Sequence, residues 1–246
     1  MRINQYIAKS GYCSRREADR LLADGNVTLN DRPASVGADV KAGDVVKING
    51  RRITPKTKGE LVYLAFHKPV GVTTTTDLRR RDNIIAFINY PERIFPVGRL
   101  DRDSEGLILL TNDGDIVNRI LRAEYGHEKE YEVTVDRPPT SAMLAEMESG
   151  IMLDGRMTLP VKIKMTGNRS FRIVLRQGLN RQIRRMCEAV GLQVTKLQRL
   201  RIMHVTLGNL KPGTYRLLTP KEMRDMRLLL EQAEAEANPR PPRTPS

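Results

Sequence analysis

Apolar residues near the start of the chain recur first at helical and then at strand spacing. Positions 3–7 carry apolar residues on one helical face, and Gly11 then interrupts the pattern. Ser14 followed by Glu17 is a capping box, which predicts a second helix running to Asp24. Short alternating runs predict two strands after it, at 27–29 and 44–48. The spacing therefore predicts a small module of two helices and a few short strands.

Longer apolar runs begin at residue 61 and predict a second, larger domain. Strands are expected at 61–67, 107–111, 129–135, 159–165, 170–176 and 193–207. Helices are expected at 116–122, 141–148, 181–190 and 220–237. Because several strands follow one another without a helix between them, we expect an α+β fold with a mixed, largely antiparallel sheet.

Two segments lack a periodic apolar pattern. Residues 49–60 are basic, contain a proline and have glycine near both ends, which is typical of an interdomain linker. Residues 238–246 are rich in proline and are predicted to be disordered. The expected organisation is a module over 1–48, the linker, a larger domain over 61–237, and the tail.

The charge balance indicates a polyanionic partner. The net charge is +13, and an electrostatic field of this sign favours nucleic acid. The chain has no tryptophan and only 4% aromatic residues, so a long platform for stacking single strands is not expected. We therefore expect lysine and arginine contacts to phosphate to dominate binding.

Composition also argues against several classes of protein. No run approaches the roughly 20 apolar residues of a membrane helix, and the N-terminus lacks the apolar stretch of a signal peptide. Cys13 and Cys187 are far apart and have no metal-ligand spacing, so neither a disulfide framework nor a metal site is expected. No glycine-rich phosphate loop is present, so we expect no cofactor. A cytoplasmic protein with reduced thiols is the simplest interpretation.

A charged segment between glycines, 98–106, precedes the apolar strand at 107–111. A solvated turn is one interpretation of such a segment. The alternation of sign favours another, because Arg99 and Arg102 flank Asp101 and a neighbouring cation lowers a carboxyl pKa by roughly 1–3 units. An ionised carboxylate held beside arginine is suited to act as a nucleophile.

A second charged segment, 177–187, combines a predicted N-cap at Asn180 with a run of arginines. One face of the helix is apolar and includes Cys187, which indicates a buried, inert thiol. The opposite face carries Arg181, Arg184 and Arg185. These arginines could be solvated, but three guanidinium groups on one face are better suited to phosphate contact.

Tyr131 and Lys68 are less decisive. Tyr131 shares a strand face with two valines, and on spacing alone a core tyrosine is the commoner outcome. Lys68 follows an apolar strand and could mark a strand end or the rim of an active site.

Taken together, these segments resemble the RsuA-type ribosomal RNA pseudouridine synthases, and within that family the RluF-like branch. Residues 1–48 resemble an S4 domain, a small αL-like RNA-binding fold, through the segments 2–8 and 14–18. The larger domain resembles the catalytic domain of the family through four motifs. They are a Lys-Pro motif at 68–71, an aspartate motif at 98–101 with 112–115, a tyrosine motif at 129–131 and an arginine motif at 178–186.

The resemblance implies the roles of the site residues. Asp101 would be the nucleophile, Arg184 would pair with it, and Tyr131 would stack on the flipped base. RNA contacts are expected from the larger domain at Arg99, Leu100, Arg102, Arg181, Gln182, Ile183, Arg185 and Lys68. RNA contacts are expected from the small module at Arg15, Arg16, Arg20 and Arg32.

The resemblance also implies the reaction and the partner. A uridine would be isomerised to pseudouridine without a cofactor or metal, in large-subunit ribosomal RNA or in a transfer-RNA anticodon arm, by a monomer. Two alternatives from other classes are a non-catalytic S4 protein of ribosome assembly and a hydrolytic N-glycosidase using Asp101 and Asp103 as a carboxylate pair. A simple binding module would not need the chain beyond residue 60, and a glycosidase would release free base.

Overall fold

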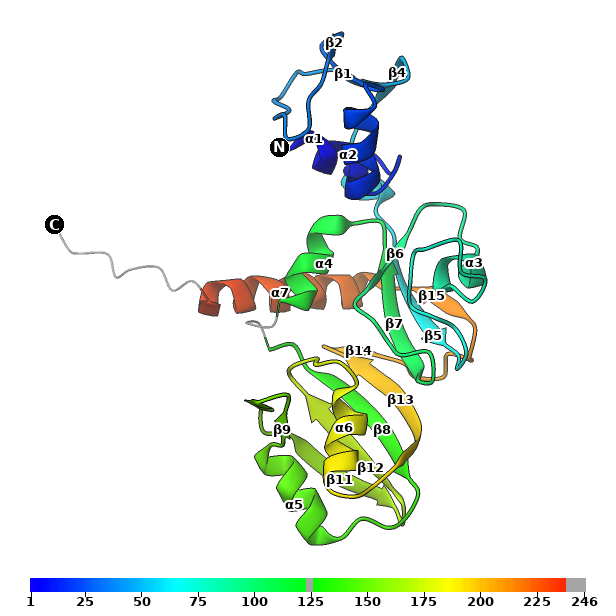
Figure 1. The fold of residues 1–246 in the computed structure, drawn as a ribbon, viewed down its shortest axis with the longest axis vertical. Coiled ribbons are helices and arrows are strands. Elements are labelled where there is room, and N and C mark those ends of the chain that lie inside the picture. Colours follow the sequence, from blue (N-terminus) through cyan, green and yellow to red (C-terminus); the bar gives the residue numbers. More distant parts are fainter. Residues whose placement is uncertain (123–125, 238–246) are drawn as a thin grey trace, which may run out of the picture. The chain divides into compact units, whose positions relative to one another are not determined.

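The computed structural model describes residues 1–122 and 126–237. The chain divides into two compact units (Figure 1). The first comprises Met1–Tyr63 with two short pieces, Tyr90–Phe95 and Thr111–Asp115, and the second comprises the rest. The predicted disordered tail at 238–246 lies outside the described residues.

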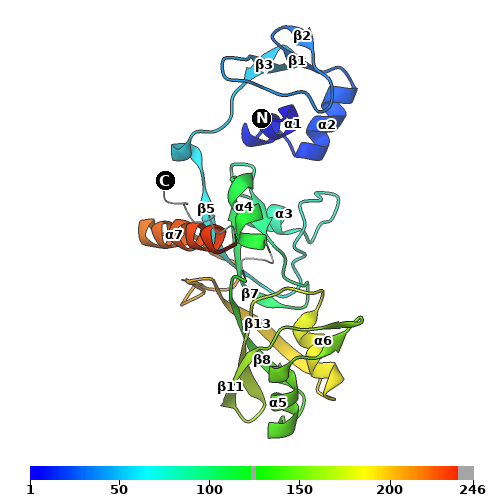
Figure 2. The same ribbon diagram turned by 90° about the vertical axis from the view of Figure 1, so that its left-hand side faces the viewer.

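The first unit contains two helices and a four-stranded antiparallel sheet. Helices α1 (Ile3–Lys9) and α2 (Arg15–Ala23) lie against one face of the sheet (Figure 2). The sheet has the order β2-β1-β3-β4, formed by Arg32–Pro33, Val27–Leu29, Val46–Ile48 and Arg51–Ile53. The predicted capping box at Ser14 and Glu17 is confirmed, with both reciprocal hydrogen bonds present. Buried residues from both helices and from β1 and β3 form one core.

The structure corrects the linker prediction for residues 51–53. These residues were expected within the linker 49–60, but they form β4 and pair with β3. Asn49 and Gly50 both have positive φ, at 47° and 78°, and join the two strands in a two-residue hairpin. An Asn-Gly pair between strands is a strong hairpin signal, which outweighs the low apolar content of the segment. A short 3-10 helix, Lys58–Glu60, follows.

The larger sheet contains nine strands among the residues that the structure describes. Its main order is β11-β12-β8-β13-β7-β5-β15, with β14 beside β13 and β6 beside β7 (Figure 1). The strands in chain order are β5 (Tyr63–Lys68), β6 (Phe95–Val97), β7 (Glu105–Thr111), β8 (Lys129–Val135), β11 (Lys162–Gly167), β12 (Ser170–Leu175), β13 (Val194–Ile202), β14 (Val205–Thr206) and β15 (Tyr215–Leu217). Strands β13 and β7 pair in parallel, whereas β8 is antiparallel to both β12 and β13. The predicted mixed, largely antiparallel sheet is confirmed.

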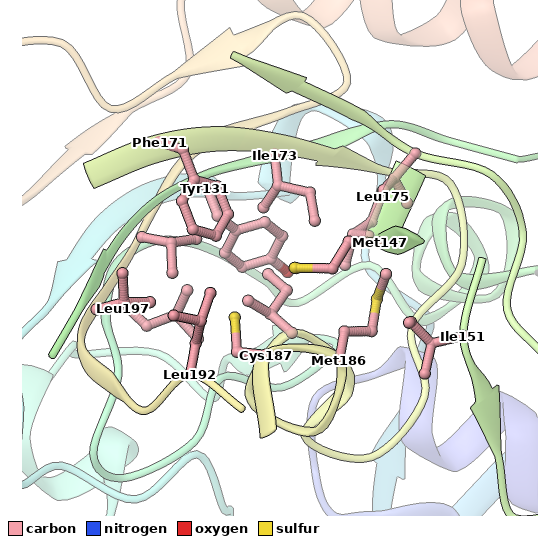
Figure 3. Close-up of a cluster of buried hydrophobic side chains, with 14 of the residues drawn as sticks. Tyr131, Met147, Ile151, Phe171, Ile173, Leu175, Met186, Cys187, Leu192 and Leu197 are labelled. Atoms are coloured by element: carbon pink, nitrogen blue, oxygen red, sulfur yellow. The ribbon is translucent and has the colours of Figure 1, made fainter. Parts of the chain in front are cut away.

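Within residues 1–122 and 126–237, five helices and a small hairpin accompany this sheet. The helices are α3 (Ile84–Ile88), α4 (Gly114–Leu121), α5 (Ser141–Ser149), α6 (Gln182–Ala189) and α7 (Pro220–Ala237). The hairpin is β9 (Met152–Leu153) with β10 (Arg156–Met157). Side chains of α5 and α6 pack with those of β8, β12 and β13 into the main core (Figure 3). This core supports one wall of the pocket described below.

Three predicted boundaries are wrong. The strand expected at 193–207 is a hairpin, because β13 ends at Ile202 and Met203 turns the chain with a φ of 53°. The strand expected at 159–165 begins only at Lys162, after Pro160, whose nitrogen cannot donate to a ladder. The N-cap of α6 is Arg181 rather than Asn180.

Candidate active site

Asp101 lies in the loop between β6 and β7 and lines a pocket of about 440 Å³. Residues 97–101 form one wall of this pocket, and residues 175–183, which lead into α6, form another. Tyr131 of β8 and Arg199 of β13 contribute from the sheet. The volume lies within the usual range for small-ligand sites, so one extruded nucleotide is an occupant of suitable size.

The main chain on both sides of Asp101 is held by hydrogen bonds. The Thr74 hydroxyl donates to the carbonyl oxygen of Leu100 at 2.7 Å and accepts from the amide of Leu100 at 3.2 Å. On the other side, the amide of Ser104 donates to the carbonyl oxygen of Asp101 at 3.1 Å. The Asp101 loop is therefore fixed in position by the protein itself, as a preorganised catalytic group requires.

The cation beside Asp101 is Arg181. Its Nη1 lies 3.7 Å from Oδ2 of Asp101 and 3.2 Å from Oδ1 of Asp103. Arg184, which was expected to pair with Asp101, instead has its Nη2 3.3 Å from Oδ2 of Asp103. Burial raises the pKa of Asp103, but the hydrogen bond from Arg181 and the charge of Arg184 hold that pKa below its ordinary value. Two carboxylates and two guanidinium groups thus form one charged cluster.

Arg184 is held inside by main-chain acceptors, which explains this difference. The side chain is only 7% exposed. Its Nη2 donates to the carbonyl oxygen of Asp103 at 3.0 Å, and its Nη1 donates to that of Val194 at 3.1 Å. The same Nη2 lies 3.3 Å from the hydroxyl of Ser104. Arg184 therefore ties the Asp101 loop to α6 and to β13, and it does not lie on a solvated arginine face.

Of the two cations that flank Asp101 in sequence, Arg102 pairs with another carboxylate. Arg102 is exposed and its Nε lies 3.1 Å from Oδ2 of Asp82. Arg99 is also exposed and lines the pocket. The prediction that these two residues hold the carboxylate is wrong for Arg102.

Tyr131 belongs both to the core and to the pocket. It is 9% exposed and packs in the main core (Figure 3). Its side chain also lines the pocket. The two interpretations of this tyrosine are therefore compatible, because one part of the ring packs and another is available to an occupant of the pocket.

Lys68 is fully buried, with no exposed surface. Its ammonium donates to the carbonyl oxygens of Pro69 at 2.9 Å and Val72 at 2.8 Å. The predicted contact between Lys68 and RNA does not fit this arrangement, because the ammonium is bonded to main-chain carbonyls and Lys68 does not line the pocket. Burial lowers the pKa of Lys68 to about 8, although the nearby charges of Asp103 and Asp101 oppose that shift.

The other residues predicted to contact RNA fall into two groups, buried residues that line the pocket and exposed arginines. Leu100, Gln182 and Ile183 are buried but line the pocket. The side chain of Arg181 is 42% exposed and that of Arg185 is 26% exposed. In the small module, Arg15, Arg16, Arg20 and Arg32 are all exposed on α2 or β2. These exposed arginines can reach a polyanion.

The pocket is strongly cationic. Among its described lining residues, Asp101 is the one carboxylate. The lining cations are Arg99, Arg122, Lys129, Arg176, Arg181 and Arg199. Such a surface is suited to the phosphates that flank a nucleotide.

The described residues hold neither a metal-binding cluster nor a membrane-spanning helix. Residues 1–122 and 126–237 contain no group of three or more histidine, cysteine, aspartate or glutamate side chains that could hold a metal ion. None of the helices in those ranges is long and apolar enough to cross a membrane. Cys187 is buried, and burial raises its pKa to about 12, which fits the predicted inert thiol.

Sequence reasoning did not assign Thr74 to this site, and it used Arg199 only, together with Arg201, as further support for phosphate contact. Thr74 belongs to a polar loop that has no motif of its own, and Arg199 is one polar position in a long strand. Only the pairing of β13 with β7 and β8 brings Arg199 to the pocket.

Comparison with known proteins links this geometry to a family. Residues 62–189 match the model for RNA pseudouridylate synthase, and residues 1–46 match the model for the S4 domain. The dual-specificity RNA pseudouridine synthase RluF of Salmonella typhi is 53% identical over 97% of this chain and 83% of its own length. Ribosomal large subunit pseudouridine synthase B of Bacillus subtilis is 34% identical over 95% of this chain and 98% of its own. A crystal structure of a pseudouridylate synthase superimposes with a TM-score of 0.67 at 29% identity, covering 92% of this chain and 99% of that one.

Proposed function

Because this chain belongs to the RsuA-type family of RNA pseudouridine synthases, we propose that Asp101 is the nucleophile with which it isomerises uridine in structured RNA. That the chain is an enzyme of this class follows from the family, which sets aside the non-catalytic and glycosidase alternatives. The observation that carries the assignment of Asp101 is its position. It is the one carboxylate among the described lining residues of a cationic, nucleotide-sized pocket, on a loop held from both sides.

The reaction rearranges one nucleotide and needs no co-reactant. The N1–C1′ bond breaks, the base turns, a C5–C1′ bond forms, and the proton from C5 is replaced by one at N1. Attack by a carboxylate on base C6 and attack on sugar C1′ both require Asp101 to be ionised. The guanidinium of Arg181 lies 3.7 Å from the carboxylate of Asp101 and helps to hold it in place.

Two further residues support the reaction in this proposal. Tyr131 stacks on the extruded uracil, since its ring lines the pocket while its other side is anchored in the core. Arg184 is a positioning residue, because its bonds to the loop at Asp103 and Ser104 lie within three residues of the nucleophile. This role replaces a direct ion pair with Asp101.

We assign docking on RNA to residues 1–48 and the reaction to residues 61–237. The exposed arginines of α2 and β2 support this division, as does the match of residues 1–46 to the S4 domain. At the pocket, Arg99, Arg181 and Arg185 are the cations assigned to phosphate near the target uridine. Extruding the base costs a few kcal/mol, which these contacts offset.

The proposed target is a uridine of large-subunit ribosomal RNA, with a transfer-RNA anticodon arm as a second substrate. One relative is named as a dual-specificity enzyme and another as a large-subunit enzyme, and both names support this choice. We propose that the protein acts as a monomer in the cytoplasm, where both RNAs are available.

Mapping pseudouridine in total RNA from cells with and without this protein tests the target. We expect one or a few sites in large-subunit ribosomal RNA, and one anticodon-arm site, to lose the modification and to regain it on complementation with the wild-type chain. Loss of sites only in other RNAs would contradict the proposed target. An unchanged map would contradict the proposed activity in that cell.

A further inference from the structure

Arg199 is a buried cation in the wall of the pocket. It lies on β13 and is only 3% exposed. Its Nε donates to the carbonyl oxygen of Leu107 at 2.6 Å, and its Nη1 donates to that of Arg99 at 3.3 Å. Nη2 is buried and has no hydrogen-bond partner within the described part of the chain. Leaving a charged donor unsatisfied in the interior is costly, so this N–H is a candidate for contact with a ligand.

The backbone fixes where this guanidinium lies. Arg199 pairs with Tyr131 across β13 and β8, and with Gly106 across β13 and β7. Gly106 has a φ of 111°, and a Cβ there would lie 2.3 Å from the carbonyl oxygen of Arg199. Only glycine allows this approach. The strand that carries Arg199 is thereby held against the strand that follows the Asp101 loop.

Two neighbours indicate what Arg199 faces. The guanidinium carbon lies 6.0 Å from the centroid of the Tyr131 ring, on the same side of the sheet as the pocket. Lys129 lines the same pocket, and burial together with the charge of Arg199 lowers the pKa of Lys129. Because the guanidinium lies over the Tyr131 ring, a base that enters the pocket at Tyr131 would lie close to these cations.

We propose that Arg199 is a further catalytic residue, whose unpartnered Nη2 binds a carbonyl oxygen of the extruded uracil and stabilises the negative charge that the ring gains during isomerisation. This inference rests on the proposed function of the pocket. When the N1–C1′ bond breaks, its electron pair stays on the uracil and spreads to the carbonyl oxygens. The charge returns to neutral when C5 bonds to C1′, the C5 proton leaves and N1 takes up a proton. A buried cation already in place favours such a step strongly.

Depth in the pocket favours a uracil oxygen over a phosphate as the partner of Arg199. The side chains of Arg181 and Arg176 are 42% and 63% exposed, so they can reach a backbone phosphate that keeps part of its hydration. Arg199 is 3% exposed, and placing a phosphate there would strip the phosphate of water. A neutral base carbonyl enters such a site at much lower cost.

The test compares Arg199→Met with Arg201→Met. Arg201 lies two residues along the same strand, is paired with Glu128 and Glu130, and does not line the pocket, so it is a matched control. Single-turnover rates at saturating RNA, RNA affinity and melting temperature are measured for both variants and the wild type. We expect Arg199→Met to lower the rate about 100-fold while RNA affinity changes less than about threefold. Arg201→Met should change the rate and the affinity less than about threefold.

A second substrate separates charge stabilisation from bracing of the loop. RNA with 5-fluorouridine at the target position carries a uracil ring that accepts negative charge more easily, and consumption of that nucleotide is followed after nuclease digestion. We expect the rate deficit of Arg199→Met relative to wild type to be at least about tenfold smaller on this RNA. If Arg199→Met does not fold, Arg199→Lys is compared with wild type on the same two RNAs. We expect its rate deficit to be smaller than that of a methionine variant, and smaller again on the fluorinated RNA.

Equal deficits on the two RNAs would overturn the proposal, because a brace for the Asp101 loop would affect both substrates alike. Loss of RNA affinity with an unchanged rate at saturation would also overturn it, in favour of a phosphate contact. If the wild-type protein itself forms no pseudouridine in this assay, the proposed function fails rather than this inference.

Discussion

Tyr131 and Arg199 lie directly opposite each other on the antiparallel strands β8 and β13, with the guanidinium carbon 6.0 Å from the ring centroid. Each residue is almost fully buried, yet each lines the pocket that contains Asp101. The sheet therefore presents an aromatic ring, with a cation over it, to whatever enters the pocket. This pairing places the ring proposed to stack on the base and the cation proposed to stabilise charge on two neighbouring strands of the sheet.

Tyr131→Phe should be much milder than Tyr131→Ala. Phenylalanine keeps the ring that we propose stacks on the base, so we expect a single-turnover rate within about tenfold of wild type. Alanine removes the stacking surface and leaves a cavity in the main core, which costs about 3–5 kcal/mol of stability. Rates are measured at saturating RNA, below the melting temperature of each variant. A phenylalanine variant as slow as the alanine variant would assign the main role to the hydroxyl.

Arg184→Ala and Arg185→Ala should differ although the residues are adjacent. Arg184 is buried and holds the Asp101 loop, so its loss should lower turnover at saturating RNA. Arg185 is partly exposed and pairs with Asp154, so its loss should weaken RNA affinity and reduce the salt slope by about one unit. Affinity as a function of salt and turnover at saturation are measured for both. The same effect on turnover would show that the two roles are wrongly divided.

Thr74→Val should lower turnover without weakening RNA binding. Valine keeps the shape but loses the hydroxyl that bonds both the amide and the carbonyl of Leu100, next to the proposed nucleophile Asp101. A small displacement of a catalytic group can cost up to about 100-fold in rate, and we expect a loss of about tenfold or more. Thr74→Ser is the matched control, because it keeps the hydroxyl and should restore most of the rate. If serine is as slow as valine, the methyl group and not the hydroxyl matters.

Lys68 should make stability depend on pH in the alkaline range. Its pKa is about 8 in the folded protein, because burial lowers it from 10.5. Between these values the folded protein has released a proton that the unfolded chain retains, so the free energy of unfolding rises with pH across this window. Below pH 8 Lys68 is charged in both the folded and the unfolded protein. The free energy of unfolding therefore gains nothing from Lys68 deprotonation there.

Urea unfolding at about pH 7.5 and about pH 9.5, for wild type and Lys68→Met, measures this effect. The methionine variant lacks the titrating group, so the wild type should gain stability relative to it at the higher pH. A difference between the two proteins that is the same at both pH values would show that Lys68 titrates alike in the folded and unfolded states.

Local signals in the sequence predicted most of the elements, and one such signal was overlooked. The capping box at Ser14 and the strand at 129–135 depend on neighbouring residues, which is why they could be predicted. Asn49-Gly50 was an equally local hairpin signal, but the basic composition around it favoured a linker. The parallel pairing of β13 with β7 joins residues about ninety positions apart, and no local pattern specifies it.

The site residues also divide into those with a local signal in the sequence and those brought together only by the fold. Asp101 stood out because opposite charges between glycines are unusual before a buried strand. Helical spacing alone placed Arg184 with the exposed arginines, since it could not show that the carbonyl groups of Asp103 and Val194 would enclose that side chain. Arg199 had no local signal either, because its neighbours in the pocket come from other strands.

Asp101→Asn tests the central claim most directly, with Asp103→Asn as the control of matched charge. Both carboxylates belong to the same cluster of arginines, but only Asp101 lines the pocket. The measurement is pseudouridine formed in a single turnover at saturating RNA, together with RNA affinity. We predict that Asp101→Asn forms none and binds RNA within about threefold of wild type, because an amide cannot replace the nucleophile. Asp103→Asn should be slowed but still form product. Retention of more than a small fraction of wild-type activity by Asp101→Asn would contradict the account.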